Sequence, residues 1–166
     1  MGSYLRVAPV LPTCLYRICF GLLGDGFLCA GGIGLDLYAE ALSTQGKKLE
    51  DGNVVMGCWA IIAEDPEKEA ARIGEHVLYQ TNEYIKWGAF GPAEETPLFE
   101  TPAAAIENGL YELWDASLAV SKLRELKRQC PMISDIHFWA QFPGESMDSG
   151  SARLTYIAEN VLPQLR

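Results

Sequence analysis

Three polar or aromatic side chains alternate near the end of the chain, and their types could bind a ligand. The segment from Asp135 to Gly144 is predicted to be a strand, because aromatic and β-branched residues run together and Pro-Gly closes it. His137, Trp139 and Gln141 share one face of that strand, since successive side chains point to opposite sides. The opposite face is apolar and comprises Ile136, Phe138, Ala140 and Phe142. A strand with one apolar face and one face of hydrogen-bonding side chains is typical of a barrel wall, so we predict that the polar face points into a barrel or its mouth. A histidine packed inside a barrel layer is the alternative interpretation of His137.

A second candidate is the glycine-rich run Gly31-Gly32-Ile33-Gly34. It follows a predicted strand from Phe27 to Ala30 and precedes a predicted helix from Asp36 to Gln45. Bare backbone amides at the start of a helix can bind phosphate, so Gly31 and Gly32 are candidates for cofactor binding. A plain turn between strand and helix is the alternative. Gly24 and Gly26 have the spacing of the first two glycines of a dinucleotide-binding fingerprint, but Cys29 occupies the position of the third glycine. A dinucleotide site is therefore not expected.

Composition excludes several other classes of function. The formal net charge is −9, and Lys and Arg form no cluster, which disfavours nucleic acid as a partner. The five cysteines form no CxxC pair and no metal-like spacing, so we expect reduced, buried thiols and no metal site. No Ser-His-Asp order, phosphate-binding Walker loop or HExxH motif is present, so no catalytic residue is assigned.

The sequence does not predict a membrane protein. Pro12, Arg17 and Asp25 interrupt the apolar segment from Leu11 to Cys29, which leaves less than the roughly 20 clean residues that a membrane-spanning helix needs. A charged residue inside this segment also argues against a signal peptide. We expect a cytoplasmic protein without a membrane partner.

The elements that must position these candidates alternate between strands and helices. A buried strand is predicted from Val54 to Ala63, and Asp65-Pro66 starts a helix that extends to about Trp87. Beyond it we predict a Gly- and Pro-rich loop (88–104), a short helix (103–113), a helix capped by Asp115 and a final helix ending at Pro163, with the 1–21 region poorly determined. Trp59 and Trp87 are expected in the core. In the last helix the expected buried residues are Leu154, Ile157, Ala158 and Val161.

This alternation is typical of a parallel α/β fold, and 166 residues fit a single domain. Only about three strands are clear, whereas a closed (β/α)8 barrel has eight strands in about 250 residues. The chain is therefore either a small open sheet or part of a barrel.

Three groups of residues, in this order, resemble the C-terminal part of the bacterial-luciferase-like monooxygenases. They are Gly24-Asp25-Gly26-Phe27, then Ala63-Glu64-Asp65-Pro66, then Phe142-Pro143-Gly144 with Val161-Leu162-Pro163. The resemblance covers roughly Leu22 to Arg166. It implies the C-terminal strands and helices of a partial TIM barrel, truncated on its N-terminal side.

The resemblance also implies a function: an oxidoreductase that uses reduced FMN or a deazaflavin coenzyme to act on a small-molecule substrate. The family's N-terminal half carries much of the cofactor surface, and its Gly-Gly-Ser-Ser-like loop is not recognisable between Val7 and Thr13. No catalytic residue is therefore carried over. The candidates for cofactor binding that the resemblance leaves are the barrel-mouth positions Gly31, Gly32, His137, Trp139 and Gln141. The chain is expected to form a homo-oligomer or to need the missing half, because a partial barrel exposes strand edges. The alternative is a non-catalytic α/β domain that self-associates or binds a protein partner through its sheet edge.

Overall fold

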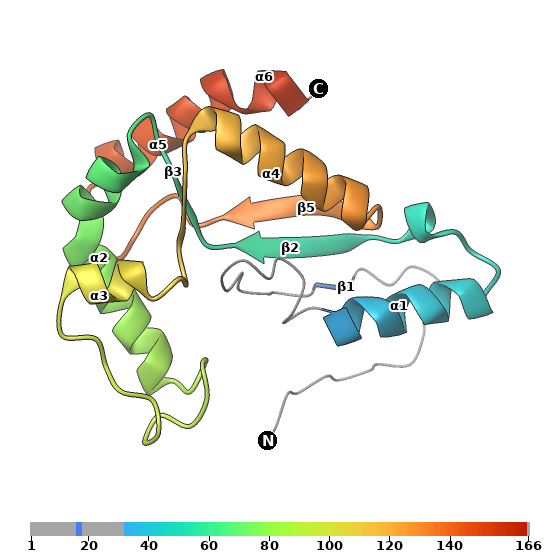
Figure 1. The fold of residues 1–166 in the computed structure, drawn as a ribbon, viewed down its shortest axis with the longest axis horizontal. Coiled ribbons are helices and arrows are strands. Elements are labelled where there is room, and N and C mark those ends of the chain that lie inside the picture. Colours follow the sequence, from blue (N-terminus) through green and yellow to red (C-terminus); the bar gives the residue numbers. More distant parts are fainter. Residues whose placement is uncertain (1–15, 18–31, 166) are drawn as a thin grey trace.

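The computed structural model describes residues 16–17 and 32–165, and the predicted strand from Phe27 to Ala30 lies outside them. The chain is a mixed α/β protein whose described strands pair in parallel (Figure 1). Its strands are β1 (Tyr16–Arg17), β2 (Val54–Cys58), β3 (Ala60–Ile62), β4 (Glu112–Trp114) and β5 (Ile133–Phe138). Its helices are α1 (Gly32–Thr44), α2 (Pro66–Lys86), α3 (Pro102–Glu107), α4 (Ala116–Gln129), α5 (Met147–Asn160) and α6 (Leu162–Leu165), with a 3-10 turn at Leu49–Asp51.

The predicted strand from Val54 to Ala63 is divided at Trp59 into two strands that have different partners. Before the break, β2 lies between β1 and β5; after it, β3 pairs with β4. The break therefore joins a three-stranded and a two-stranded sheet through one continuous segment.

Two apolar clusters lie on the two sides of this segment. The first packs β2 and β5 against α4, and its members include Met56, Cys58, Leu123 and Leu126. The second packs Trp59 and Ile61 against α2. Along β3, Ala60 and Ile62 face the first cluster while Ile61 faces the second, as the two-residue period of a strand requires.

Helix α2 crosses the molecule at the end toward which β2 and β5 point (Figure 1). As the sequence predicts, Asp65 caps it by accepting a hydrogen bond from the Lys68 N–H at 3.0 Å, and Pro66 occupies its first turn. Ala70, Ile73 and Val77 are buried on its inner stripe. This helix therefore forms a wall beside the carboxyl ends of the two strands.

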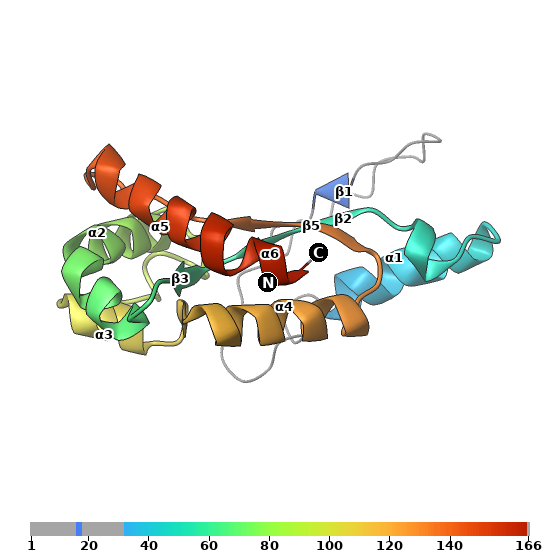
Figure 2. The same cartoon turned by 90° about the horizontal axis from the view of Figure 1, so that it is seen from above.

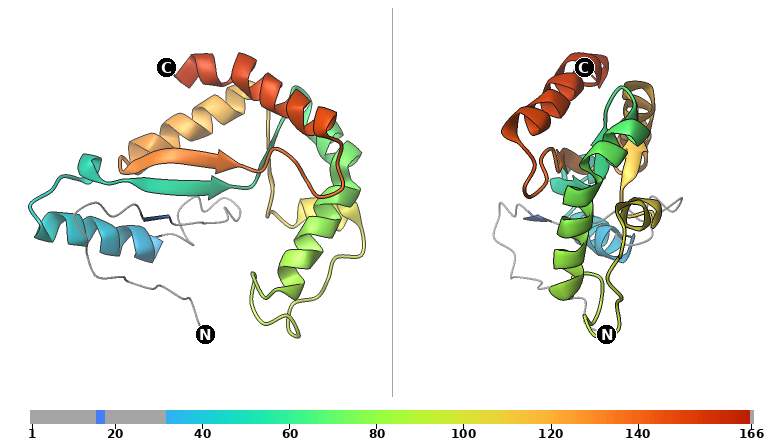
Figure 3. Two further views of the ribbon diagram at one scale, coloured as in Figure 1. Left: turned by 180° about the vertical axis from the view of Figure 1, so that it is seen from behind. Right: turned by 90° about the vertical axis from the view of Figure 1, so that its left-hand side faces the viewer.

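Helix α4 and the nearly continuous pair α5 and α6 run lengthwise beside β2 and β5, and α1 lies at the opposite end from α2 (Figures 2 and 3). As predicted, Asp115 caps α4. Ala119, Leu123 and Leu126 of this helix face the core. The segment between β5 and α5 leads back to α2, which brings the start of α5 against the start of α2.

Several sequence predictions are wrong in detail. Strand β5 ends at Phe138, because its partner β2 ends at Cys58, so Trp139 and Gln141 lie beyond it. The predicted helix 103–113 ends at Glu107, where Asn108 Nδ2 donates to the Ala105 carbonyl and Gly109 takes a positive φ of 81°. The residues that follow are free to form β4. Helix α1 begins at Gly32, four residues earlier than predicted.

The burial pattern of two helices also differs from the prediction. Trp87 caps the C-terminus of α2 and is 71% exposed, because the helix ends before it reaches the core again. In α5, Leu154 is 55% exposed and Ala158 is exposed, whereas Arg153 is buried. The buried stripe of the last helices therefore passes through Arg153, Ile157 and Val161.

Candidate functional site

The candidate site lies at the carboxyl ends of β2 and β5. Val54, Met56 and Cys58 face the first apolar cluster, so the alternate residues Val55 and Gly57 face the other way. Across the strand pair, Asp135 is opposite Val55 and His137 is opposite Gly57. Asp135 and His137 are both exposed. Gly57 is buried and Val55 is half-buried. We call Val55, Gly57, Asp135 and His137 the second face of the sheet.

Two tryptophans continue the two strands of the second face beyond the strand ends. Trp59 follows Gly57 by two residues and Trp139 follows His137 by two, and their ring centroids are 5.4 Å apart. Trp59 is 8% exposed and Trp139 is half-buried. Phe90 and Tyr111 contact Trp59 from the side of α2, at 5.7 and 5.2 Å between centroids. The strand ends thus carry an aromatic shelf formed by Trp59 and Trp139, beside the exposed imidazole of His137.

The remaining sequence candidates are placed elsewhere or lie outside the described residues. Gln141 is exposed, and its Nε2 donates to the Glu145 carbonyl at 3.2 Å and to Met147 Sδ at 3.1 Å, so its amide is directed toward the start of α5. Gly32 is the first residue of α1, and Gly31 is outside the described part of the chain. The structure thus places Trp139 against Trp59 and sets Gln141 against the next helix.

A network of charged side chains, two of which are buried, holds the segment between Trp139 and α5 in place. Glu69, Arg72, Glu145 and Arg153 make up this network, which we call the ion clasp. Arg153 Nη1 donates to Glu69 Oε1 and to Glu145 Oε1, each at 2.6 Å, and Nη2 donates to the Ala140 carbonyl at 2.7 Å. Nη2 also pairs with Glu145 Oε2, which completes a bidentate contact. Arg153 is 4% exposed and the Glu145 side chain 2%.

The surroundings of the clasp keep its carboxylates charged. Burial acts to raise the pKa of Glu145, but hydrogen bonds from Arg153, from Ser149 and from the Phe142 N–H outweigh it and lower that pKa to about 2. The hydrogen bonds of Glu69 with Arg72 and Arg153 likewise lower the pKa of Glu69. Two carboxylates thus balance two guanidinium groups, so the clasp is a positioning device that carries no free acid or base.

The sequence predictions missed Arg153 and Glu145, although a signal for Arg153 exists. Arg153 precedes Ile157 by four residues and Val161 by eight, so it occupies the buried stripe of the last helix. A charged side chain on such a stripe requires a buried partner. Glu145 gives no comparable signal, since it begins the polar run that continues to Ser151.

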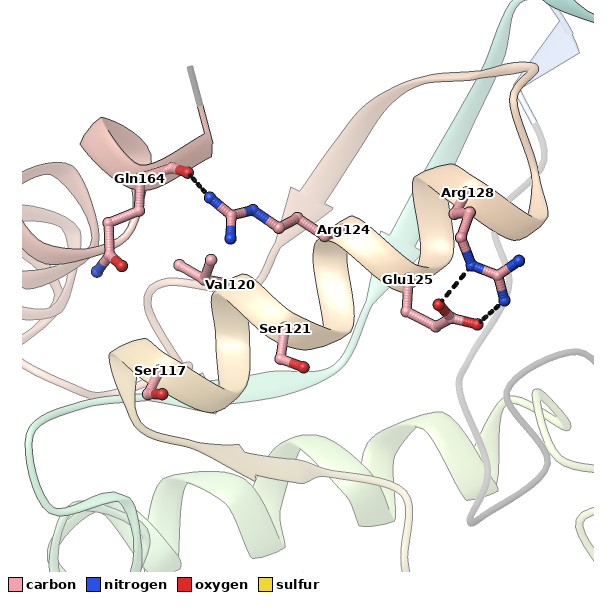
Figure 4. A pocket seen from close by; sticks show the side chains of 7 residues that line it. All are labelled: Ser117, Val120, Ser121, Arg124, Glu125, Arg128 and Gln164. Atoms are coloured by element: carbon pink, nitrogen blue, oxygen red, sulfur yellow. Dashed lines mark hydrogen bonds and ion pairs between the residues drawn. The ribbon is translucent and has the colours of Figure 1, made fainter.

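Two hollows open on the surface. One, of about 400 Å³, lies beside the clasp, and its lining includes Arg72, Asp148 and Tyr156. The other, of about 510 Å³, lies between α4 and α6 (Figure 4). There Arg124 Nη2 donates to the Gln164 carbonyl at 2.6 Å, and Arg128 forms a fork with Glu125. Both guanidinium groups in this second hollow are thus already engaged with the protein.

Within residues 32–165, no cluster of three or more His, Cys, Asp or Glu side chains could hold a metal ion. None of the helices in that part of the chain is long and apolar enough to cross a membrane. Cys58 and Cys130 are free, buried thiols, as predicted, while the other cysteines lie outside the described residues. No family model matches the chain, and comparisons with curated proteins and with solved structures also give no match.

Proposed function

We propose that the chain is the C-terminal portion of a flavin- or deazaflavin-dependent oxidoreductase of the luciferase-like family, and that the reduced cofactor's ring binds at the aromatic shelf. The observation that carries this proposal is the pair Trp59 and Trp139, 5.4 Å apart, at the carboxyl ends of two parallel strands. In parallel α/β proteins ligands bind at that edge. The partial barrel remains part of the proposal, and the parallel strands and flanking helices are consistent with it.

The residues at the shelf suit a planar, partly polar ring. The half-buried indole of Trp139 offers a flat apolar surface that the buried ring of Trp59 supports from behind, and the exposed imidazole of His137 can donate or accept a hydrogen bond at the cofactor ring's polar edge. Gly57, opposite His137, adds no side chain there. When bound, the cofactor supplies the hydride or the activation of oxygen, while these residues bind and orient it. Gly32, the first residue of α1, is proposed to contact its phosphate, and the other candidate, Gly31, lies outside the described residues.

The test is a titration of the purified chain with FMN and with a deazaflavin coenzyme, monitored by cofactor fluorescence. We expect saturable binding that W139A weakens by about tenfold, because loss of one stacked ring removes about 1.5 kcal/mol. W114F is the matched control: Trp114 is 1% exposed and contacts Phe138 in the other cluster, so affinity should stay unchanged. Absence of binding, or equal affinity of W139A and the parent protein, would reject the shelf as the cofactor site.

A second candidate function follows from the edge of the sheet. Among the described strands β5 pairs only with β2, so its outer backbone edge has no strand partner. Such an edge can pair with a strand of another chain. Light scattering during size exclusion at increasing protein concentration tests this function, and a monomer at every concentration would exclude self-association through β5.

A further inference from the structure

A row of four aromatic rings leads from the strand ends to the protein surface. Trp139 contacts Trp59 at 5.4 Å between centroids, Trp59 contacts Tyr84 at 5.1 Å, and Tyr84 contacts Trp87 at 5.5 Å. These separations lie within the range of direct aromatic contact, and each pair is tilted or edge-to-face. The rings come from the end of β5, the break between β2 and β3, and the last turns of α2. They thus connect three separate segments without a gap.

Core packing accounts for only part of this row. Trp59 is 8% exposed and belongs to the second apolar cluster, with Tyr84 and Trp139 packed against it. Trp87 is outside that cluster, is 71% exposed, and contacts the row only through the ring of Tyr84. A tryptophan with so much of its surface in water adds little to the stability of the core. Its place at the end of an unbroken row of rings suggests a role that requires contact with water.

The chemistry shared by these side chains is one-electron oxidation. Indole and phenol rings lose an electron more readily than other side chains, and rings in van der Waals contact exchange electrons quickly. An oxidised indole becomes a stable neutral radical once its N–H proton has left. Water can accept that proton from Trp87, which is exposed, whereas Trp59 is buried.

The second apolar cluster contains another aromatic neighbour of Trp59 that is harder to oxidise. Tyr111 also contacts Trp59, at 5.2 Å, but it is 5% exposed. Its hydroxyl accepts a hydrogen bond from Gln80 Nε2 at 3.2 Å, and burial raises the pKa of Tyr111 to about 12. Oxidation of a phenol requires release of its proton, which this environment opposes. Oxidation of Trp59 is therefore passed on through Tyr84 to Trp87 in preference to Tyr111.

We propose that Trp139, Trp59, Tyr84 and Trp87 form an electron relay that carries oxidising equivalents from the strand ends to the surface. A high-potential metal complex beside Trp139 accepts one electron from its ring and leaves an indole radical cation. Trp59 returns an electron to Trp139, and Trp87 returns one to Trp59 through the ring of Tyr84. The radical cation at Trp87 then releases its N–H proton to water. The net result is one electron gained by the oxidant, one neutral radical at Trp87 and one proton in solution. The relay depends only on the chain's own rings, not on flavin binding.

The chain offers an attachment point for a test. A photo-oxidant, a rhenium(I) tricarbonyl diimine complex, coordinates accessible imidazoles, and the sequence contains two histidines. H76Q leaves exposed His137, two residues from Trp139 along the chain, as the only site. After a laser flash on this labelled variant, transient absorption follows the tryptophan radical. A nitroso spin trap with peptide mass spectrometry then locates it.

We expect a long-lived neutral tryptophan radical with the spin-trap adduct at Trp87. W87F and W59F in the same background should both lose the long-lived signal, because the charge then recombines with the reduced rhenium complex. W114F should retain it, since Trp114 lies outside the row. W87F removes only an exposed ring and therefore tests the relay even if W59F folds poorly. A radical of unchanged yield and lifetime in W87F, or an adduct that stays at Trp139, would overturn the proposal.

Discussion

Replacement of Arg153 by methionine should destabilise the chain more than any substitution of an exposed arginine. Methionine keeps much of the length and apolar stem of arginine but removes the guanidinium group that contacts Glu145, Glu69 and the Ala140 carbonyl. The Glu145 side chain, 2% exposed, would then be a buried carboxylate without its bidentate partner. Removal of one member of a buried ion pair typically costs about 3–5 kcal/mol.

The structure places the expected loss at the lower end of that range. Glu145 would keep its hydrogen bonds with Ser149 and with the Phe142 N–H, and Arg72 Nη2 remains 3.5 Å from its Oε1. We therefore expect R153M to lower the free energy of unfolding by about 3 kcal/mol. With a urea m-value of about 2 kcal/mol per molar, the midpoint falls by about 1.5 M.

Urea unfolding monitored by circular dichroism measures this midpoint. The matched control is R128M, because Arg128 makes a similar fork with Glu125 but the two side chains are 72% and 44% exposed. That variant should unfold at nearly the same urea concentration as the parent protein, because exposed ion pairs contribute little to stability. The double variant R153M/E145Q should recover part of the loss, since no buried carboxylate remains unpaired. If R153M and R128M have the same midpoint, the clasp contributes no more than a surface pair and the argument fails.

Three further predictions concern the same fold. The pKa of Glu145 is lowered from 4.5 to about 2, so its contribution to stability is present above pH 4.5 and is lost as the pH falls toward 2; E145Q should flatten this part of the stability profile in acid titrations. G74A should lower the melting temperature, because the new Cβ would lie 2.8 Å from Pro102 Cβ, and overpacking of about 1–3 kcal/mol exceeds the gain in helix propensity of about 1 kcal/mol. Burial, with a smaller contribution from Glu112, raises the pKa of Cys58, so a disulfide reagent should modify Cys58 only at the rate of unfolding; rapid modification mapped to this peptide would contradict its burial.

Local signals in the sequence predicted the helices better than the sheets. The caps of α2 and α4 were identified from Asp65 and Asp115, because a capping side chain acts within four residues of chain. The division of the predicted strand from Val54 to Ala63 at Trp59 could not be predicted, since ten residues without a polar side chain do not indicate which strand each half pairs with. Strand β4 has only three residues and exists because β3 lies beside it, so tertiary pairing decided its structure.

The candidate site shows the same division between local and long-range information. The two-residue period predicted His137 and Trp139 on one face, and the structure does place them in alternate positions beside Gly57 and Trp59. Gln141 continues the same period in the sequence, but the strand ends three residues before it. Strand periodicity no longer applies there, and its amide is directed by the Glu145 carbonyl instead.

After β5 ends at Phe138, the ion clasp holds the backbone in place of strand pairing. The same contacts that stabilise the fold therefore also fix the position of Trp139. The segment from Trp139 to Glu145 forms neither helix nor strand, yet the clasp binds it at two backbone groups, the Ala140 carbonyl and the Phe142 N–H. The guanidinium group of Arg153 also lies 5.6 Å from the ring centroid of Phe142. Ala140 is adjacent to Trp139, so loss of the hydrogen bond from Arg153 to the Ala140 carbonyl removes a constraint on the backbone that positions the Trp139 indole against Trp59. R153M should therefore weaken cofactor binding and electron transfer even at temperatures where the variant stays folded, whereas R128M should change neither.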